Sequence, residues 1–414
     1  LQGDWQEGPA GVPELSIHQE EIDTLEMIRD SGAFDKIIVV VNSGYAMELG
    51  WLADYGVDAC LWVGYPGNYG MHGVALAILG QADPSGRNVI TYAADSLSSA
   101  AMQNAGDFTF DNLTGQYKNK YLVYAEGIYV GYKYYETRYQ DQVLGINNAA
   151  GAKGVYASDG GSWDYADGMV FTFGAGMSYA DFTQELVSVN WDKEAHTVTA
   201  EVKVTNNGSP NHTGVSKDVV QLYVQLPWEA GQAEKSAIQL VDFAKTGDLA
   251  AGESETVTLE FSDYLFATYD QNAANGADPS KTGCYVFDAG DYYFAIGDDA
   301  HDALNNVLAA RHRHVRRRGQ PGPRRRGQGL SGHPGRNGQH DLRRFPLHRR
   351  GGLQPLCRPG HQLLHPRRGD LHDPGRLEHL PRHGGDPHRH AGDPGPDGEL
   401  PVREARRRAR HLRL

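Results

Sequence analysis

The sequence predicts a mixed fold, an α/β layer followed by an antiparallel β-sandwich. Residues 37–41 (IIVVV) form an unbroken apolar run, which is typical of a parallel strand that is covered on both faces. From about residue 184, apolar residues recur at every second position in short segments, which is typical of antiparallel strands with one buried face. A change of composition after residue 310 marks a third region.

Helices and strands alternate in the first region. Ile22, Leu25 and Ile28 recur at helical spacing within residues 19–33, and Gly32 supplies a stop signal. After this helix the sequence predicts, in order, a strand, a short helix, a buried strand and a helix: residues 37–41, 46–54, 57–63 and 70–79. This alternation predicts a parallel sheet.

The middle of the chain gives weaker signals. Residues 96–123 are polar and rich in Gly and Asn, and they predict a long surface loop. A tyrosine-dense stretch follows at residues 124–139, and residues 140–168 predict irregular structure because they are rich in Gly, Ala and Asp.

The period-2 segments predict a β-sandwich of immunoglobulin or fibronectin type. In one of them Val198, Ala200, Val202 and Val204 alternate with polar residues, which predicts a strand with one solvent-exposed face and one buried face. The predicted strands are residues 186–192, 196–207, 218–227, 253–262 and 290–298. We therefore expect an α/β sandwich domain at 1–165, a connector at 166–183, a fibronectin type III-like domain at 184–310 and a tail at 311–414.

The tail has an unusual composition. Residues 311–414 hold 25 Arg, no Lys, 9 Asp and Glu, 13 His and a single Phe, so their net charge is +16, while residues 1–310 carry −29. So few large apolar residues cannot form a packed core, which predicts disorder. A basic arm for nucleic acid is one interpretation. We favour a frameshift in a GC-rich gene, and therefore no nucleic-acid partner.

Several classes of protein are excluded by simple counts. Three cysteines (Cys60, Cys284 and Cys357) are too few and too scattered for a disulfide framework or a zinc cluster. No apolar run reaches the length of a membrane span, so we expect no membrane partner. We expect neither a metal nor a cofactor. The first ten residues lack the pattern of a secretion signal, and the sequence leaves open whether the protein is cytoplasmic or secreted.

Three carboxylates are candidates for chemistry, each with a structural alternative. Glu48 follows a strand's carboxyl end, where α/β sheets place ligands, but a carboxylate on a helix surface is the simpler interpretation. Asp58 is better explained as a strand-end carboxylate, and Glu126 as a structural residue of the tyrosine stretch.

Other candidates have equally plain explanations. Four tyrosines could stack on sugar rings, although packing against a neighbouring barrel domain is favoured: Tyr129, Tyr132, Tyr134 and Tyr135. His72 has no partner at metal-ligand spacing, Cys60 is expected to be a buried thiol, and the segment ADPSGR (82–87) predicts a β-turn.

Six ordered segments resemble family 3 glycoside hydrolases, the β-glucosidase-like enzymes. The likeness covers about residues 12–310, which makes it more specific than any single motif. The segments are KIIVVVNSGYAMELGWL (36–52), LWVGYPGNYGMHGVALAILGQADPSGRNVITY (61–92), YAEGIYVGYKYYETRY (124–139), FTFGAGMSYADF (171–182), DVVQLYV (218–224) and LAAGESETVTLEF (249–261). In the fourth segment Ala175 stands where an aromatic residue is usual in the family.

The resemblance implies a retaining glycosidase that hydrolyses terminal β-linked sugars, with β-glucosides or related short glycosides as substrates. Enzymes of this family generally begin with a barrel that supplies an aspartate nucleophile, followed by an α/β sandwich that supplies a glutamate acid/base. The sequence starts within the α/β sandwich, so we expect the chain to be a fragment that is inactive alone and has the barrel as its intramolecular partner.

Glu7 is the one candidate for the acid/base within the chain. Glu7-Gly8 resembles the family's acid/base loop, but the surrounding segment DWQEGPAGVPELS lacks the usual flanking Gly and Asp. The alternative is an acid/base that precedes Leu1, with Glu7 a solvated loop carboxylate. A different class of function is also open: a non-catalytic carbohydrate-binding or interaction module. The resemblance does not fix the sugar, because glucose, xylose, arabinose and N-acetylglucosamine substrates all occur in the family.

Overall fold

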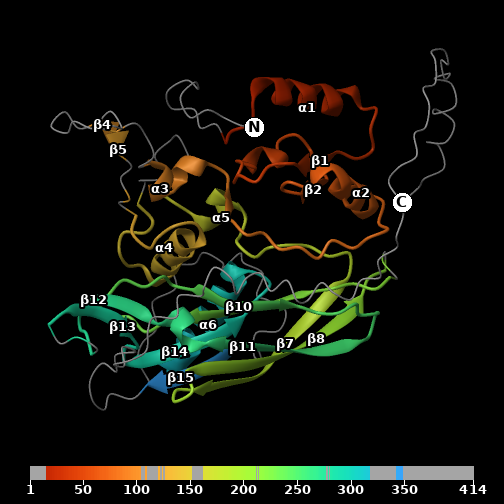
Figure 1. Cartoon of the computed structure of the whole chain (residues 1–414). Coiled ribbons are helices and arrows are strands. Elements are labelled where there is room, and N and C mark those ends of the chain that lie inside the picture. Colours follow the sequence, from red (N-terminus) through yellow and green to blue (C-terminus); the bar gives the residue numbers. More distant parts are fainter. Residues whose placement is uncertain are drawn as a thin grey trace, which may run out of the picture. The chain divides into compact units, whose positions relative to one another are not determined.

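The computed structural model describes residues 15–103, 108–109, 120–121, 124, 126–151, 162–210, 212, 214–276, 278, 280–317 and 342–347 (Figure 1). No helix within these ranges is long and apolar enough to cross a bilayer.

The first region contains a two-stranded parallel sheet with helices before and after it. The two strands run parallel, as the sequence predicted, and Val39 in the first lies opposite Cys60 in the second. A small core beneath the sheet includes Val41, Leu49 and Tyr92. The elements are α1 (Gln19–Ser31), β1 (Ile38–Val41), η1 (Gly50–Leu52), β2 (Ala59–Trp62) and α2 (Gly67–Ile78).

Helix α1 begins and ends where the sequence indicates. At its start the backbone N–H of His18 donates to the Glu21 carboxylate (3.0 Å), which is one half of a capping box. At its end Gly32 adopts a left-handed conformation with φ 56°, which glycine accepts without strain.

The middle of the chain is more ordered than predicted. The expectation of a continuous loop over 96–123 is wrong in part, because Asp95 caps a 3₁₀ turn by accepting from the N–H of Leu97 (2.8 Å). Two antiparallel pairs also form here, β3 with β6 and β4 with β5. The elements are β3 (Tyr92–Ala93), η2 (Ser96–Ser98), α3 (Ala100–Gln103), β4 (Phe108–Thr109), β5 (Lys120–Tyr121), α4 (Tyr132–Leu144), α5 (Tyr165–Gly168) and β6 (Met169–Phe171).

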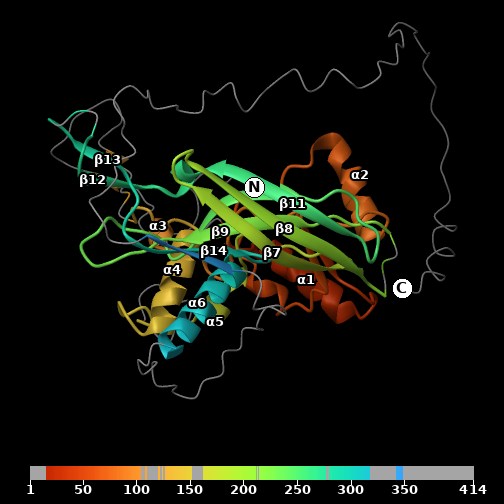
Figure 2. The same ribbon diagram turned by 90° about the horizontal axis from the view of Figure 1, so that it is seen from below.

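The rest is an antiparallel β-sandwich, which confirms the predicted fold class. One sheet has the strand order β10-β9-β14-β15 and the other β11-β8-β7 (Figure 2). Register shifts interrupt one edge strand of each sheet, between Leu240 and Asp242 in β10 and between Leu186 and Ser188 in β7. The elements are β7 (Asp181–Asp192), β8 (Thr197–Gly208), β9 (Val219–Gln225), β10 (Gln239–Lys245), β11 (Ser254–Ser262), η3 (Asp263–Phe266), β12 (Thr268–Ala274), β13 (Thr282–Val286), β14 (Gly290–Ile296), α6 (Ala300–Arg317) and β15 (Leu342–Leu347).

Two cores hold this part together. The first lies between the sheets and includes Leu222, Val202 and Phe294, none of them exposed. The second lies where α6 packs on the first sheet, with α4 beside it, and it joins Leu304 to Tyr223. The tyrosine stretch therefore covers the β-sandwich, although about forty residues of sequence separate it from β7.

The structure places two elements beyond the predicted end of the sandwich at residue 310. Helix α6 continues to Arg317, and β15 pairs with β14 through residues of the Arg-rich region. The sequence predicted no element in this region because its composition favours disorder. The other residues of 311–414 lie outside the described residues.

Candidate functional site: the carboxyl edge of β1 and the domain junction

Glu7 lies outside the described residues, which begin at Leu15. The structure therefore shows the site only from Leu15 onward. Leu15 and Ser16 are attached to the loop that follows β1, and α/β sheets bind ligands at the carboxyl ends of their strands.

Glu48 makes this attachment with both its backbone and its side chain. Its N–H donates to the carbonyl of Leu15 (2.9 Å), and its carboxylate accepts from the Ser16 hydroxyl (2.6 Å) and from the N–H of Ser96 (2.7 Å). One half-buried carboxylate thus joins three segments at one edge of the sheet.

These contacts explain why the predicted helix over 46–54 is wrong. The N–H of Glu48 is used by Leu15, and its carbonyl accepts from the indole N–H of Trp51 (2.7 Å). The third N–H of a helix has no partner within that helix, so the carbonyl is decisive: the N–H of Leu52 donates to Leu49 (3.2 Å) instead of to Glu48, and only the 3₁₀ turn η1 forms. Glu48 is therefore not the helix-surface carboxylate that the sequence favoured.

Of the remaining polar candidates, Asp58 has a structural role, and the contacts define no role for His72 or Cys60. Asp58 ends the loop before β2 by accepting from Lys36 Nζ (2.7 Å) and from the N–H of Ile37 (2.9 Å), which confirms the strand-end interpretation. His72 is exposed on α2. Cys60 is half-buried, and burial raises the pKa of its thiol.

The tyrosines of the dense stretch are used inside the chain. The ring of Tyr132 stacks on Phe173 with a centroid distance of 4.3 Å. The hydroxyl of Tyr135 is buried against Ser98 Oγ (3.0 Å), and that of Tyr129 donates to Glu234. These contacts position the rings within the fold, mostly at the junction with the β-sandwich.

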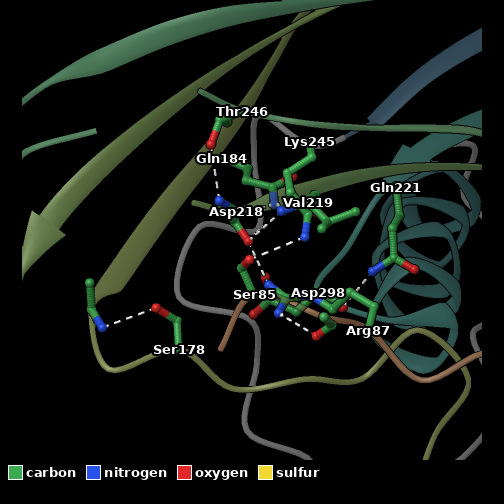
Figure 3. A network of polar contacts seen from close by, with 12 residues as sticks. Ser85, Arg87, Ser178, Gln184, Asp218, Val219, Gln221, Lys245, Thr246 and Asp298 are labelled. Atoms are coloured by element: carbon green, nitrogen blue, oxygen red, sulfur yellow. Dashed lines mark hydrogen bonds and ion pairs between the residues drawn. The ribbon is translucent and has the colours of Figure 1, made fainter. Parts of the chain in front are cut away.

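A buried ion pair crosses that junction (Figure 3). Arg87 Nη2 donates to Asp218 (2.5 Å), with 12% of the arginine and 3% of the aspartate side chain exposed. Asp218 also accepts from Gln184 Nε2 (2.8 Å) and from the N–H of Val219 (2.8 Å). Because the donors surround the carboxylate, its buried charge is compensated.

The ADPSGR segment is therefore more than the plain turn that the sequence predicted. Besides Arg87, its Asp83 accepts from the hydroxyl of Ser178 (2.5 Å) and the N–H of Tyr179 (2.7 Å), and its Ser85 accepts from Lys245 Nζ (3.1 Å). Three side chains of one short segment thus bind the connector, the start of β9 and the end of β10. The alternation of polar and turn residues gave no signal of these distant partners.

Sequence reasoning also missed Glu136. It lies on α4 with 1% of its surface exposed, and it contacts Tyr165 and His301. Within the described residues no group of three or more His, Cys, Asp or Glu side chains is arranged to hold a metal ion.

Models of known protein families match both parts of this arrangement. Residues 9–132 match the glycosyl hydrolase family 3 C-terminal domain, so this match spans the β1–β2 sheet and ends where α4 begins. Residues 218–300 match the fibronectin type III-like domain. The chain carries the C-terminal domain of glycosyl hydrolase family 3. The Arg87–Asp218 pair thus joins a family 3 domain to its fibronectin-like neighbour.

Curated relatives of this family 3 chain include β-glucosidases. A β-glucosidase of Ruminococcus albus is 29% identical over 279 residues, which are 67% of this chain and 24% of the relative. β-Glucosidase A of Butyrivibrio fibrisolvens is 28% identical over 295 residues, 67% of this chain and 30% of the relative. The chain thus spans about a quarter to a third of the length of the relatives it matches.

Solved structures give the same family 3 likeness. A β-glucosidase from Paenibacillus barengoltzii superimposes with a TM-score of 0.52 and 28% identity, over 68% of this chain and 26% of that one. β-Glucosidase 3B from Thermotoga neapolitana, in complex with glucose, has a TM-score of 0.50 and 25% identity, over 70% of this chain and 33% of that one.

Proposed function

We propose that this chain is the α/β and fibronectin-like part of a retaining glycosidase that hydrolyses terminal β-linked sugars of β-glucosides or related short glycosides. The hydrogen bonds of Leu15 and Ser16 to Glu48 carry the proposal, because they attach the start of the described chain to the loop after β1, and α/β sheets bind ligands at the carboxyl ends of their strands. The relatives named β-glucosidase support the substrate class.

Glu7 is the proposed acid/base. Retaining hydrolysis needs two carboxyl groups about 5–5.5 Å apart, one to attack the sugar and one to protonate the leaving oxygen and then activate water. We propose that the first comes from a barrel domain encoded outside these 414 residues. Glu7 takes the second role, and the chain alone is then inactive.

The test is hydrolysis of an aryl β-glucoside by the gene product that includes the barrel. Glu7→Gln should lower kcat by about 10²–10⁴-fold and abolish the alkaline limb of the pH–rate profile, because that limb reports the loss of the acid's proton. Glu20→Gln, an exposed carboxylate at the start of α1, is the matched control and should leave both unchanged. An unaltered kcat in Glu7→Gln excludes Glu7 as the acid/base. Hydrolysis by the 414-residue chain alone contradicts the proposal that the nucleophile comes from the barrel.

A binding module without hydrolysis is the second candidate, favoured by exposed aromatic rings at the same edge. Tyr45 and Tyr65 follow β1 and β2 and are 52% and 74% exposed. Tyr65 lies against Gly44, where an added Cβ would overlap its ring. This candidate expects glucoside binding to the chain alone, weakened by Tyr65→Ala, together with no hydrolysis when the barrel is restored.

A further inference from the structure

The strands β12 and β13 carry aromatic rings on a face that the fold leaves open to water. They form a two-stranded antiparallel sheet of their own (Figure 2). Successive side chains of a strand point to opposite faces. Cys284 and Val286 are buried on one face, whereas Tyr285 lies on the other, directly opposite Tyr269. The pair of strands therefore has one packed face and one face of tyrosines.

The ring of Tyr269 lies over a glycine of the neighbouring strand. Gly283 is on the tyrosine face, two residues before Tyr285, and it is nevertheless buried. A Cβ added there would overlap the Tyr269 hydroxyl and lie 3.1 Å from its Cζ. The φ of Gly283, 95°, also disfavours any side chain. One side of the Tyr269 ring thus rests on β13, and because 55% of the residue is exposed, the other side faces water.

Two further rings stand beside Tyr269. The centroid of Tyr285 is 5.2 Å from that of Tyr269, with an interplanar angle of 66°. Beyond it, Tyr264 of η3 is exposed and has its centroid 4.6 Å from that of Tyr285, at 56°. The steep angles make a corner, in which a flat ligand that stacks on Tyr269 meets the edge of Tyr285.

The chemistry of this face fits a neutral, hydroxylated ligand. Besides the tyrosine hydroxyls it carries the amide of Gln271, which is exposed on the same face of β12 as Tyr269. Lys281, which precedes β13, is paired with Asp278 (3.0 Å). A sugar ring is complementary to such a face, because its C–H groups stack on an aromatic ring and its hydroxyls bind polar groups at the rim. Nucleic acid, by contrast, needs unpaired cations for its phosphates.

We propose that Tyr264, Tyr269 and Tyr285 form a binding site for the glucose units of a β-glucan chain. The site lies within the residues that match the fibronectin type III-like domain. The choice of a β-linked glucan rests on the proposed function. The role of the tyrosines is to tether a polysaccharide, which raises the effective concentration of its chain ends at a hydrolytic site of the same protein.

Native electrophoresis of the 414-residue chain tests the site, with hydroxyethyl cellulose, a soluble β-glucan, in the gel. The glucan should retard the unaltered chain. Tyr269→Ala should weaken binding by about tenfold or more, since a few central aromatic rings carry most of the energy of a binding surface. Tyr269→Phe should keep most of the binding because it keeps the ring. Tyr69→Ala, which removes an exposed tyrosine of α2, is the matched control and should change nothing.

A second variant covers the case in which Tyr269→Ala disturbs the fold. Gln271→Ala changes an exposed polar residue on the same face, a class of substitution that rarely affects stability, and it should weaken retardation by a smaller factor. Circular dichroism checks that both variants are folded. Retardation that is absent in the unaltered chain, or that is equal in the unaltered chain and both variants, overturns the proposal.

Other occupants of the face give different results. Adsorption to neutral phosphatidylcholine vesicles, or dimerisation of the chain, that depends on Tyr269 and occurs without retardation by the glucan also overturns the proposal. Hydrolysis of an aryl β-glucoside is a separate measurement, because this small substrate is not a polysaccharide that needs a tether. Failure of hydrolysis with retardation intact therefore contradicts the proposed function alone.

Discussion

At the scale of single residues, burial separates two ion pairs that look alike in sequence. Arg87–Asp218 has side chains 12% and 3% exposed, whereas those of Lys36–Asp58 are 69% and 34% exposed. Removing one partner of a buried pair strands a charge in a site of low dielectric, while water screens an exposed charge.

Arg87→Met should therefore destabilise the chain by about 3–5 kcal/mol, because Asp218 would remain buried without its cation. Lys36→Met is the matched control and should change stability little. Urea unfolding of both variants, followed by circular dichroism, makes the comparison. Equal effects of the two substitutions on the free energy of unfolding would show that burial does not increase the contribution of the ion pair.

Individual site residues could be predicted only where the signal is local. Asp58 was predictable as a strand-end carboxylate because its partners, Lys36 and Ile37, flank the neighbouring strand. The roles of Arg87 and Glu136 were not predictable, since Asp218 and His301, with which they pair, lie more than a hundred residues away in sequence. Their burial depends on tertiary contacts that no local pattern encodes.

At the scale of elements, two glycines should respond to alanine with opposite signs. Gly145 ends α4 with φ 69°, a conformation that a side chain strains, whereas Gly73 lies within α2 with open space around its position. Gly145→Ala should cost about 1 kcal/mol, and Gly73→Ala should stabilise by about 0.5–1 kcal/mol by restricting the unfolded chain. Thermal unfolding of the two variants checks this, and a shift of the same sign in both would contradict it.

The elements themselves were predictable in proportion to their periodicity. The strands β8 and β11 alternate strictly and were found from sequence, as was the apolar run of β1. Helix α4 was missed because its tyrosines are poor indicators of an apolar helix face. Helix α6 has Ala300, Leu304 and Val307 at helical spacing, but this pattern runs into the Arg-rich composition that predicts disorder.

At the scale of the whole molecule, the contacts of ADPSGR should make the family 3 domain and the β-sandwich unfold together. Asp83 binds the connector just before β7, and Arg87 binds Asp218 at the start of β9. Calorimetry on the unaltered chain should show one transition for these regions, and the double variant Asp83→Ala/Arg87→Met should show two. If the double variant still shows a single transition, other contacts, chiefly those of α4, make the two parts unfold together.

The register shifts in β7 and β10 have a further consequence for how molecules of this chain meet one another. An edge strand with regular, unused N–H and C=O groups is a template onto which another chain can add. Each bulge bends its strand and breaks the even spacing of those groups. The Lys245 charge at the end of β10 adds a cost to burying that edge. One border of each sheet is thus a poor template for open-ended aggregation.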